Sequence, residues 1–219
     1  MLRLLKLNES NISVIIIVLF TVGLGLHLLP LTHHYVLAIT DIFMLFTNSL
    51  VLYFVFREQE NKTLIIWSFA ALILTFVIEV IGVRTGMIFG DYHYGKTMMI
   101  QFFEVPVVIG MNWVLLILGT YSISQWLKLK HVFVPLVSSV LIVGFDFIME
   151  KVAVRLDYWQ WEGNVIPIRN YISWFFISLI FTSILSLLKV KINNRLLKIY
   201  FIVQLGFFIG LRLFLNGVA

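Results

Sequence analysis

The sequence of 219 residues contains no cysteine. Disulfides, thiolate metal ligands and cysteine nucleophiles are therefore excluded. Charged residues are also scarce, at 12% of the chain, whereas soluble domains carry about 25%. The polar segments between apolar runs are too short to form a soluble module. The remaining composition, with 61% hydrophobic residues, 20 Phe and a mean hydropathy of +1.01, is typical of a polytopic membrane protein.

Several motifs of membrane enzymes are missing as well. The five histidines include no helical HxxxH pair, which argues against a di-iron desaturase, hydroxylase or ketolase. No aspartate-rich DDxxD motif is present to bind magnesium pyrophosphate, and no Walker or dinucleotide pattern is present to bind a nucleotide. The last apolar run has no central Lys for the Schiff base of a rhodopsin. We therefore expect no metal and no other cofactor.

Seven apolar stretches are long enough to cross a bilayer, which takes about 20 residues. Together they predict an all-α bundle of seven transmembrane helices that forms a single domain over residues 1–219. No small-residue cleavage site follows the first stretch, so we interpret it as a retained helix. The predicted spans are 12–29, 36–56, 63–82, 104–126, 131–150, 171–189 and 196–215.

The basic residues divide unevenly between the two ends of this bundle. Because they lie in loops, membrane topology explains the net charge of +5, and we expect no binding of nucleic acid. The positive-inside rule predicts an N-terminus in the cytoplasm and a location in the cell membrane. Ten of the sixteen lie at the end that holds the N-terminus: Arg3, Lys6, Arg57, Lys62, Lys128, Lys130, Lys189, Lys191, Arg195 and Lys198.

Eight of the eleven carboxylates gather at the opposite end: Asp41, Glu79, Asp91, Glu104, Asp146, Glu150, Asp157 and Glu162. A solvated rim that balances nearby basic groups would account for Asp91, Asp157 and Glu162. Asp146 and Glu150 differ, because they lie inside an apolar span and share one helix face. An ionised carboxylate at membrane depth costs several kcal/mol unless it is paired or hydrated. We therefore expect at least one of the two to be protonated.

Two long segments at this end resemble each other. Each contains an acid, an Arg, an Asp-Tyr pair and a Gly, followed by a Pro seven residues before a Trp. We interpret them as a weak parallel repeat, for which ancestry and chance both remain open because other spacings differ. The prolines suit the first turn of a helix, which would direct two positive helix ends at the acidic region. The pairs are Pro106 with Trp113 and Pro167 with Trp174.

Aromatic residues accompany the acids in both segments. Trp and Tyr commonly anchor helices at the membrane boundary, and that role alone would account for Tyr92, Tyr94, Tyr158, Trp159 and Trp161. Ring faces beside buried acids would also stabilise a carbocation without attacking it. Neutralisation of carboxylates and capping of helix ends are the two roles open to Arg84, Arg155 and Arg169.

Four motifs within residues 79–174 carry a resemblance to a known family: EVIGVRTGMIFGDYHYG, VPVVIGMNW, GFDFIMEKVAVRLDYWQWEG and IPIRNYISW. The chain resembles the integral-membrane carotenoid biosynthesis proteins, which include carotenoid 1,2-hydratases and bisanhydrobacterioruberin hydratase. It departs from that pattern at Lys151, where a proline would follow the acid, and at NVIP, which replaces a turn that carries glycine. The resemblance implies a hydro-lyase that hydrates the terminal double bond of an acyclic, ψ-ended carotenoid such as lycopene, without a cofactor.

This reaction would need a strong acid in a low-dielectric pocket, ring faces around a tertiary cation, and one water. On this hypothesis Asp146 donates the proton, and Glu150 or Glu79 is its coupled partner and the base that directs water. Asn170 would hold water or orient an acid. The other candidates for substrate binding are Tyr92, Tyr94, Trp113, Trp174, Arg84, Trp159 and Trp161. The polyene could lie against Phe43, Phe46, Phe76, Phe89, Phe102 and Phe103, although each of these could equally face lipid.

Two other functions remain open. A proton-coupled transporter would use Asp146, Glu150, Glu79 and Asp41 as a relay, although these acids lie toward one end instead of the midplane. A membrane carotenoid end-group cyclase would use the same acid and cation but exclude water. The expected partners are an acyclic carotenoid, the lipid bilayer and other enzymes of the carotenoid pathway.

Overall fold

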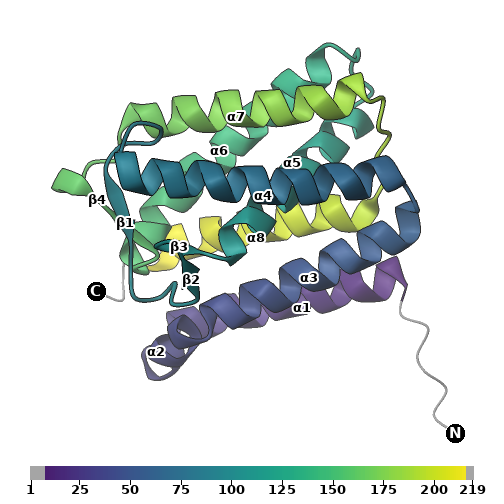
Figure 1. The fold of residues 1–219 in the computed structure, drawn as a ribbon. Coiled ribbons are helices and arrows are strands. Elements are labelled where there is room, and N and C mark those ends of the chain that lie inside the picture. Colours follow the sequence, from purple (N-terminus) through teal and green to yellow (C-terminus); the bar gives the residue numbers. More distant parts are fainter. Residues whose placement is uncertain (1–7, 216–219) are drawn as a thin grey trace, which may run out of the picture.

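The computed structural model describes residues 8–215, and within them seven helices are long and apolar enough to cross a membrane (Figure 1). This confirms the predicted all-α bundle and indicates an integral membrane protein. Arg3 and Lys6, which were counted at the N-terminal end, lie outside the described residues. The spanning helices are α1 (Glu9–Leu28), α3 (Thr40–Gln59), α4 (Lys62–Thr85), α5 (Val108–Trp126), α6 (Phe133–Arg155), α7 (Ile168–Leu187) and α8 (Arg195–Phe214).

Three helices that begin at the basic end start in the same way. An Asn precedes each of α1, α4 and α8, and its side-chain oxygen accepts a hydrogen bond from a backbone N–H in the first turn. The caps are Asn8, Asn61 and Asn194, with N···O distances of 2.9, 3.1 and 2.9 Å. Each cap satisfies a donor that the helix itself leaves free, which fixes where the helix starts.

The second predicted span began too early, because a short helix, α2 (Pro30–Ala38), precedes α3. Pro30 stands at the first position of α2, where its missing N–H is tolerated. The hydroxyl of Thr32 donates to the carbonyl of Leu26 at 2.6 Å and joins α2 to the end of α1. The helical backbone is interrupted at Ile39, and α3 begins at the next residue.

The fourth predicted span also began too early, because a tight hairpin precedes α5. Strand β2 (Gln101–Phe102) pairs with β3 (Val105–Pro106), and Phe103 and Glu104 between them both have positive φ. Pro106 therefore lies in a strand and not in the first turn of α5, as the sequence predicted. Pro167, by contrast, lies directly before the first residue of α7.

The two segments that resemble each other in sequence pair with each other in space. Strand β1 (Tyr92–Tyr94) follows α4, and β4 (Trp159–Trp161) follows α6. The strands are antiparallel, with Tyr92 opposite Trp161 and Tyr94 opposite Trp159. A short 3-10 turn, η1 (Glu162–Asn164), follows β4. This pairing closes the end of the bundle at which α4 and α6 finish (Figure 1).

Helix α5 lies at the centre of the bundle, and most of its residues are buried. It packs against α4, α6 and α8, while α6 packs on α7 and α1 packs on α8. Two glycines allow the close approach of its neighbours. A Cβ at Gly110 would come within 2.9 Å of the Leu72 carbonyl, and one at Gly119 within 3.0 Å of Phe201. Small residues serve helix packing in membranes in this way.

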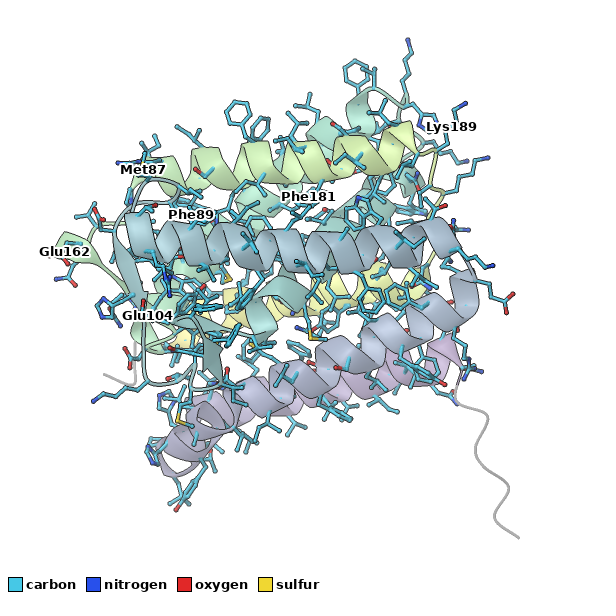
Figure 2. All side chains as sticks on the ribbon, viewed as in Figure 1. Met87, Phe89, Glu104, Glu162, Phe181 and Lys189 are labelled. Carbon is cyan, nitrogen blue, oxygen red and sulfur yellow. The ribbon has the colours of Figure 1, made fainter. Side chains whose placement is uncertain are left out.

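The charge sorting expected from the sequence is visible in the fold. Glu104 and Glu162 lie at one end of the bundle and Lys189 at the other (Figure 2). Helix α6 runs to Arg155, five residues beyond its predicted end, which leaves Asp146 and Glu150 inside the helix. The buried acids are thus held on regular helical backbone.

Candidate active site

A cavity of about 240 Å³ lies inside the bundle, between α1, α3 and α8 on one side and the paired β1 and β4 segments on the other. Most of its wall is apolar. Phe20, Leu26, Met44, Ile109, Phe207 and Phe208 are among the residues that form it. Polar and acidic side chains occupy restricted parts of the wall, and the carboxylates of Glu79 and Glu150 are among them.

Glu79, near the end of α4, is buried and receives three hydrogen bonds. Its Oε2 atom accepts from the hydroxyls of Tyr92 at 2.6 Å and Tyr94 at 3.2 Å. Its Oε1 atom accepts from the indole N–H of Trp113 at 2.8 Å. Burial raises the pKa of Tyr92 and of Tyr94 well above the ordinary range, and the Glu79 carboxylate raises both further. The phenols therefore keep their protons and remain donors.

Glu150, on α6, is buried in a matching way. Its Oε2 atom accepts from the indole N–H groups of Trp159 at 3.0 Å and Trp161 at 2.8 Å. Its Oε1 atom accepts from the side-chain amide of Asn170 at 3.0 Å. The same amide nitrogen donates to Oδ2 of Asp146 at 2.8 Å. One carboxamide on α7 therefore bridges two carboxyl groups on successive turns of α6.

Asp146 is fully buried, and its second oxygen, Oδ1, has no hydrogen-bond partner among the described residues. The described residues that line the cavity include Glu150 and Asn170 but not Asp146. Asp146 is thus connected to the cavity through Asn170. Asp146 and Glu150 share one face of α6, as the four-residue spacing predicted. They differ in that Glu150 lines the cavity and Asp146 does not.

The hydrogen bonds to Glu79 and Glu150 follow the same order along the chain. Each acid lies near the end of a helix, receives two donors from the strand that follows, and one from the helix after that. Trp113 and Trp174, which occupy matching places after the two prolines, stack with ring centroids 3.8 Å apart and planes 15° apart. The resemblance between the segments therefore extends from sequence to contacts.

Aromatic rings form the part of the wall beside the acids. Tyr92 lies 4.9 Å from Trp161 between ring centroids, and Tyr94 meets Trp159 edge to face at 6.0 Å. The fold brings nine of the predicted site residues to the cavity: Glu79, Tyr92, Tyr94, Trp113, Glu150, Trp159, Trp161, Asn170 and Trp174.

Some candidates lie elsewhere. Arg84 is exposed, and its guanidinium carbon sits 5.1 Å from the ring centroid of Phe103, away from the cavity. Arg169 donates to the carbonyls of Gly86 and Met87 and so caps the end of α4. Asp41 is buried and accepts from the backbone N–H of Ile100 at 2.8 Å. Of the six Phe proposed for the polyene, Phe43 and Phe89 line the cavity, Phe76 stacks on Phe102, and Phe46, Phe102 and Phe103 are exposed.

The polar residues on the wall that were not identified from the sequence include His27 on α1, Asn112 on α5 and Gln204 on α8. Each is a polar side chain inside an apolar span, which is a signal of function in a membrane protein. Attention to charged residues alone overlooks this signal.

The fold and the cavity define a polytopic helical membrane protein that buries carboxyl groups against an aromatic wall. The family model for carotenoid biosynthesis proteins matches residues 39–217. The chain therefore belongs to this family and is an integral membrane protein of carotenoid biosynthesis. No curated protein and no solved structure matches it.

Proposed function

We propose that the protein is a hydro-lyase that adds water to the terminal 1,2 double bond of an acyclic, ψ-ended carotenoid and needs no cofactor. The observation that carries this proposal is the pair of carboxyl groups, Asp146 and Glu150, bridged by Asn170 beside an apolar cavity walled with aromatic rings. Protonation of an unactivated alkene needs an acid that keeps its proton in a dry environment, and a pair of buried carboxyl groups beside an apolar cavity supports that role.

Glu150 is the better candidate for the proton donor, because it lines the cavity and Asp146 does not. This assignment replaces the sequence-based hypothesis that Asp146 donates. All the donors to the pair are neutral amide or indole groups, and two adjacent carboxyl groups without a cation ionise together only at high cost. Oε2 of Glu150 already accepts two hydrogen bonds, whereas Oε1 accepts one. Oε1 therefore has room for the proton that Glu150 shares with Asp146.

Transfer of that proton to C2 of the alkene leaves a tertiary cation at C1. Trp113, Trp174 and Trp161 line the cavity, and ring quadrupoles stabilise positive charge without bonding to it. Glu79 lines the same wall and accepts three hydrogen bonds, in the same pattern as Glu150.

The size of the cavity suits one end of the substrate. At about 240 Å³ it falls below the usual range for drug-sized ligands, so it encloses an end group and not a whole polyene. Val22 on α1 and Ile39 before α3 line the cavity and are also 53% and 52% exposed on the outside of the bundle. We infer that the end group passes between α1 and α3 while the rest of the carotenoid stays in the lipid.

The direct test is expression in a bacterium that accumulates lycopene, followed by liquid chromatography and mass spectrometry of the pigments. Wild type should yield a product heavier by one water, and Glu150→Gln should yield none while the protein remains in the membrane. Glu162→Gln, at an exposed acid of the same end, is the matched control and should retain activity. An isomer of unchanged mass would identify a cyclase instead, and unchanged pigment would contradict hydration of lycopene.

We further propose that the protein lies in the cell membrane with its N-terminus in the cytoplasm, because basic residues gather at that end. Because the sequence contains no cysteine, a single introduced thiol is the one site in this protein that a thiol reagent can label. Lys191→Cys and Glu162→Cys place one exposed thiol at each end of the bundle. An impermeant maleimide added to whole cells should label only the thiol at position 162. Labelling of position 191 alone would reverse the orientation.

A further inference from the structure

His27, on α1, presents an unused hydrogen-bond acceptor at the cavity. Its Nδ1 atom lies 2.7 Å from the carbonyl oxygen of Gly23. Because a carbonyl oxygen only accepts, Nδ1 must carry the hydrogen, and in the neutral ring Nε2 then carries a lone pair. Nε2 is buried and has no partner among the described residues, and His27 lines the cavity.

Gln204, on α8, presents a second such atom. Its Nε2 donates to the hydroxyl oxygen of Tyr200 at 3.0 Å and to Oδ1 of Asn112 at 3.2 Å. The Tyr200 hydroxyl in turn donates to Oδ1 of Asn48, which leaves its oxygen to accept from Gln204. This chain of bonds fixes the orientation of the Gln204 amide. Its Oε1 atom is buried without a partner within residues 8–215, on the wall of the same cavity.

These two acceptors lie on different helices from the acid pair. Helix α1 packs on α8, whereas Asp146, Glu150 and Asn170 belong to α6 and α7, which pack on each other (Figure 1). The oxygens of Glu79 and Glu150 all accept hydrogen bonds from protein donors. A water molecule needs acceptors for its hydrogens. Among the fully buried side-chain atoms of residues 8–215, the acceptors on this cavity wall that have no hydrogen bond are Nε2 of His27 and Oε1 of Gln204.

We infer that the α1–α8 wall binds the water for the reaction, and that His27 is the base that accepts its proton. This inference rests on the proposed hydration. The proton from the acid pair forms the C2–H bond, and a lone pair of the water oxygen then forms the C1–O bond. The water transfers one proton to Nε2 of His27, and that proton returns to the acid pair, so that each cycle consumes one alkene and one water. Gln204 holds a further water at the same wall.

His27 lies outside the part of the chain that the family model matches. The family model matches residues 39–217, so α1, α2 and His27 lie outside the matched part. The acids and their aromatic partners lie inside it. The α1 wall is therefore a part of the site at which this chain can differ from other carotenoid biosynthesis proteins.

The test measures how the cation divides between alcohol and alkene. Purified protein in lipid nanodiscs is incubated with the acyclic carotenoid in deuterium oxide. A cation that captures water gives the alcohol, whereas one that loses a proton returns to an alkene that carries deuterium. His27→Phe keeps a ring of similar shape but removes the acceptor. It should lower the ratio of alcohol to deuterated alkene by about a hundredfold or more, because a general base typically contributes about two to four orders of magnitude. His27→Gln restores an acceptor and should recover part of the ratio.

The control is His34→Phe, the same substitution at an exposed histidine on α2, and its ratio should equal that of wild type. A parallel loss of alcohol and deuterated alkene in His27→Phe would mean a structural role and would overturn the inference. An unchanged ratio would also overturn it while leaving the hydratase proposal intact. Absence of alcohol from wild type would remove both proposals, which keeps the two failures distinguishable.

Discussion

The indole rings of Trp113 and Trp174 stack at 3.8 Å between centroids and join α5 to α7 across the site. Each Trp comes seven residues after a proline in one of the two similar segments. Only Trp113 donates its N–H to Glu79, at 2.8 Å. The two rings therefore share a position in the repeat but differ in the hydrogen bond that they supply.

This difference predicts unequal effects of the same substitution. Trp113→Phe leaves Oε1 of Glu79 without its donor, and an unsatisfied buried acceptor costs about 1–3 kcal/mol of folding free energy. Trp174→Phe changes the stack but leaves the hydrogen bonds of Glu79 in place. The midpoint temperature of thermal unfolding, measured in detergent, and the turnover should both be lower in Trp113→Phe than in Trp174→Phe. Equal losses in the two variants would show that the stack, and not the hydrogen bond, holds the site.

The assignment of the proton donor predicts an order of severity for two isosteric substitutions. Glu150→Gln removes the proton that faces the cavity and should lower turnover by about two to four orders of magnitude, the usual contribution of a general acid. Asp146→Asn removes the coupled partner but leaves Glu150, the proposed donor, on the cavity wall. The loss of turnover in this variant should therefore be smaller. Turnover is measured at equal amounts of folded protein. The reverse order would assign proton donation to Asp146.

The cavity itself can be tested with two glycines on α1. Gly23 lines the cavity, and a Cβ there would lie 3.8 Å from Phe207, which is ordinary contact. Gly25, half a turn away, has open space around it. Leu favours a helix more than Gly does, so both Gly→Leu variants should fold. Gly23→Leu should raise KM or lower turnover by narrowing the cavity, whereas Gly25→Leu should behave as wild type. Equal activity of both would mean that the substrate does not use this cavity.

The environment of Tyr92 predicts a pH response. Burial raises its pKa well above the ordinary value of 10.0, and the neighbouring Glu79 raises it further, so the neutral phenol persists as the pH rises through that value. The ultraviolet absorbance of tyrosinate between about pH 9 and pH 10 should therefore be the same in wild type and in Tyr92→Phe. If the variant lost the amplitude of one tyrosine over this interval, Tyr92 would not be buried as described.

Hydropathy and charge were enough to predict the seven spans, and the position of Asp146 and Glu150 inside a span was enough to mark them as candidates for function. The partners of these acids could not be predicted, because they depend on the pairing of β1 with β4. Helical spacing placed both acids on one face but did not specify that Glu150 alone would reach the cavity.

Arg84 illustrates a further limit of sequence reasoning. Its charge and its place in a motif suggested binding, yet the end of α4 directs it outward onto Phe103. His27 shows the converse. It carries no signal beyond being polar in an apolar span. Its proposed role depends on the bond from Nδ1 to the carbonyl of Gly23, on the unpartnered Nε2 and on its place in the cavity wall.

Addition of water to an alkene at this acidic cavity is tested most directly with labelled water. Purified wild-type protein, an acyclic carotenoid and water enriched in oxygen-18 should give an alcohol that carries the heavy isotope, and Glu150→Gln should give none. An alcohol without the isotope, or equal labelled product from the variant, would contradict addition of water at this site with Glu150 as the proton donor.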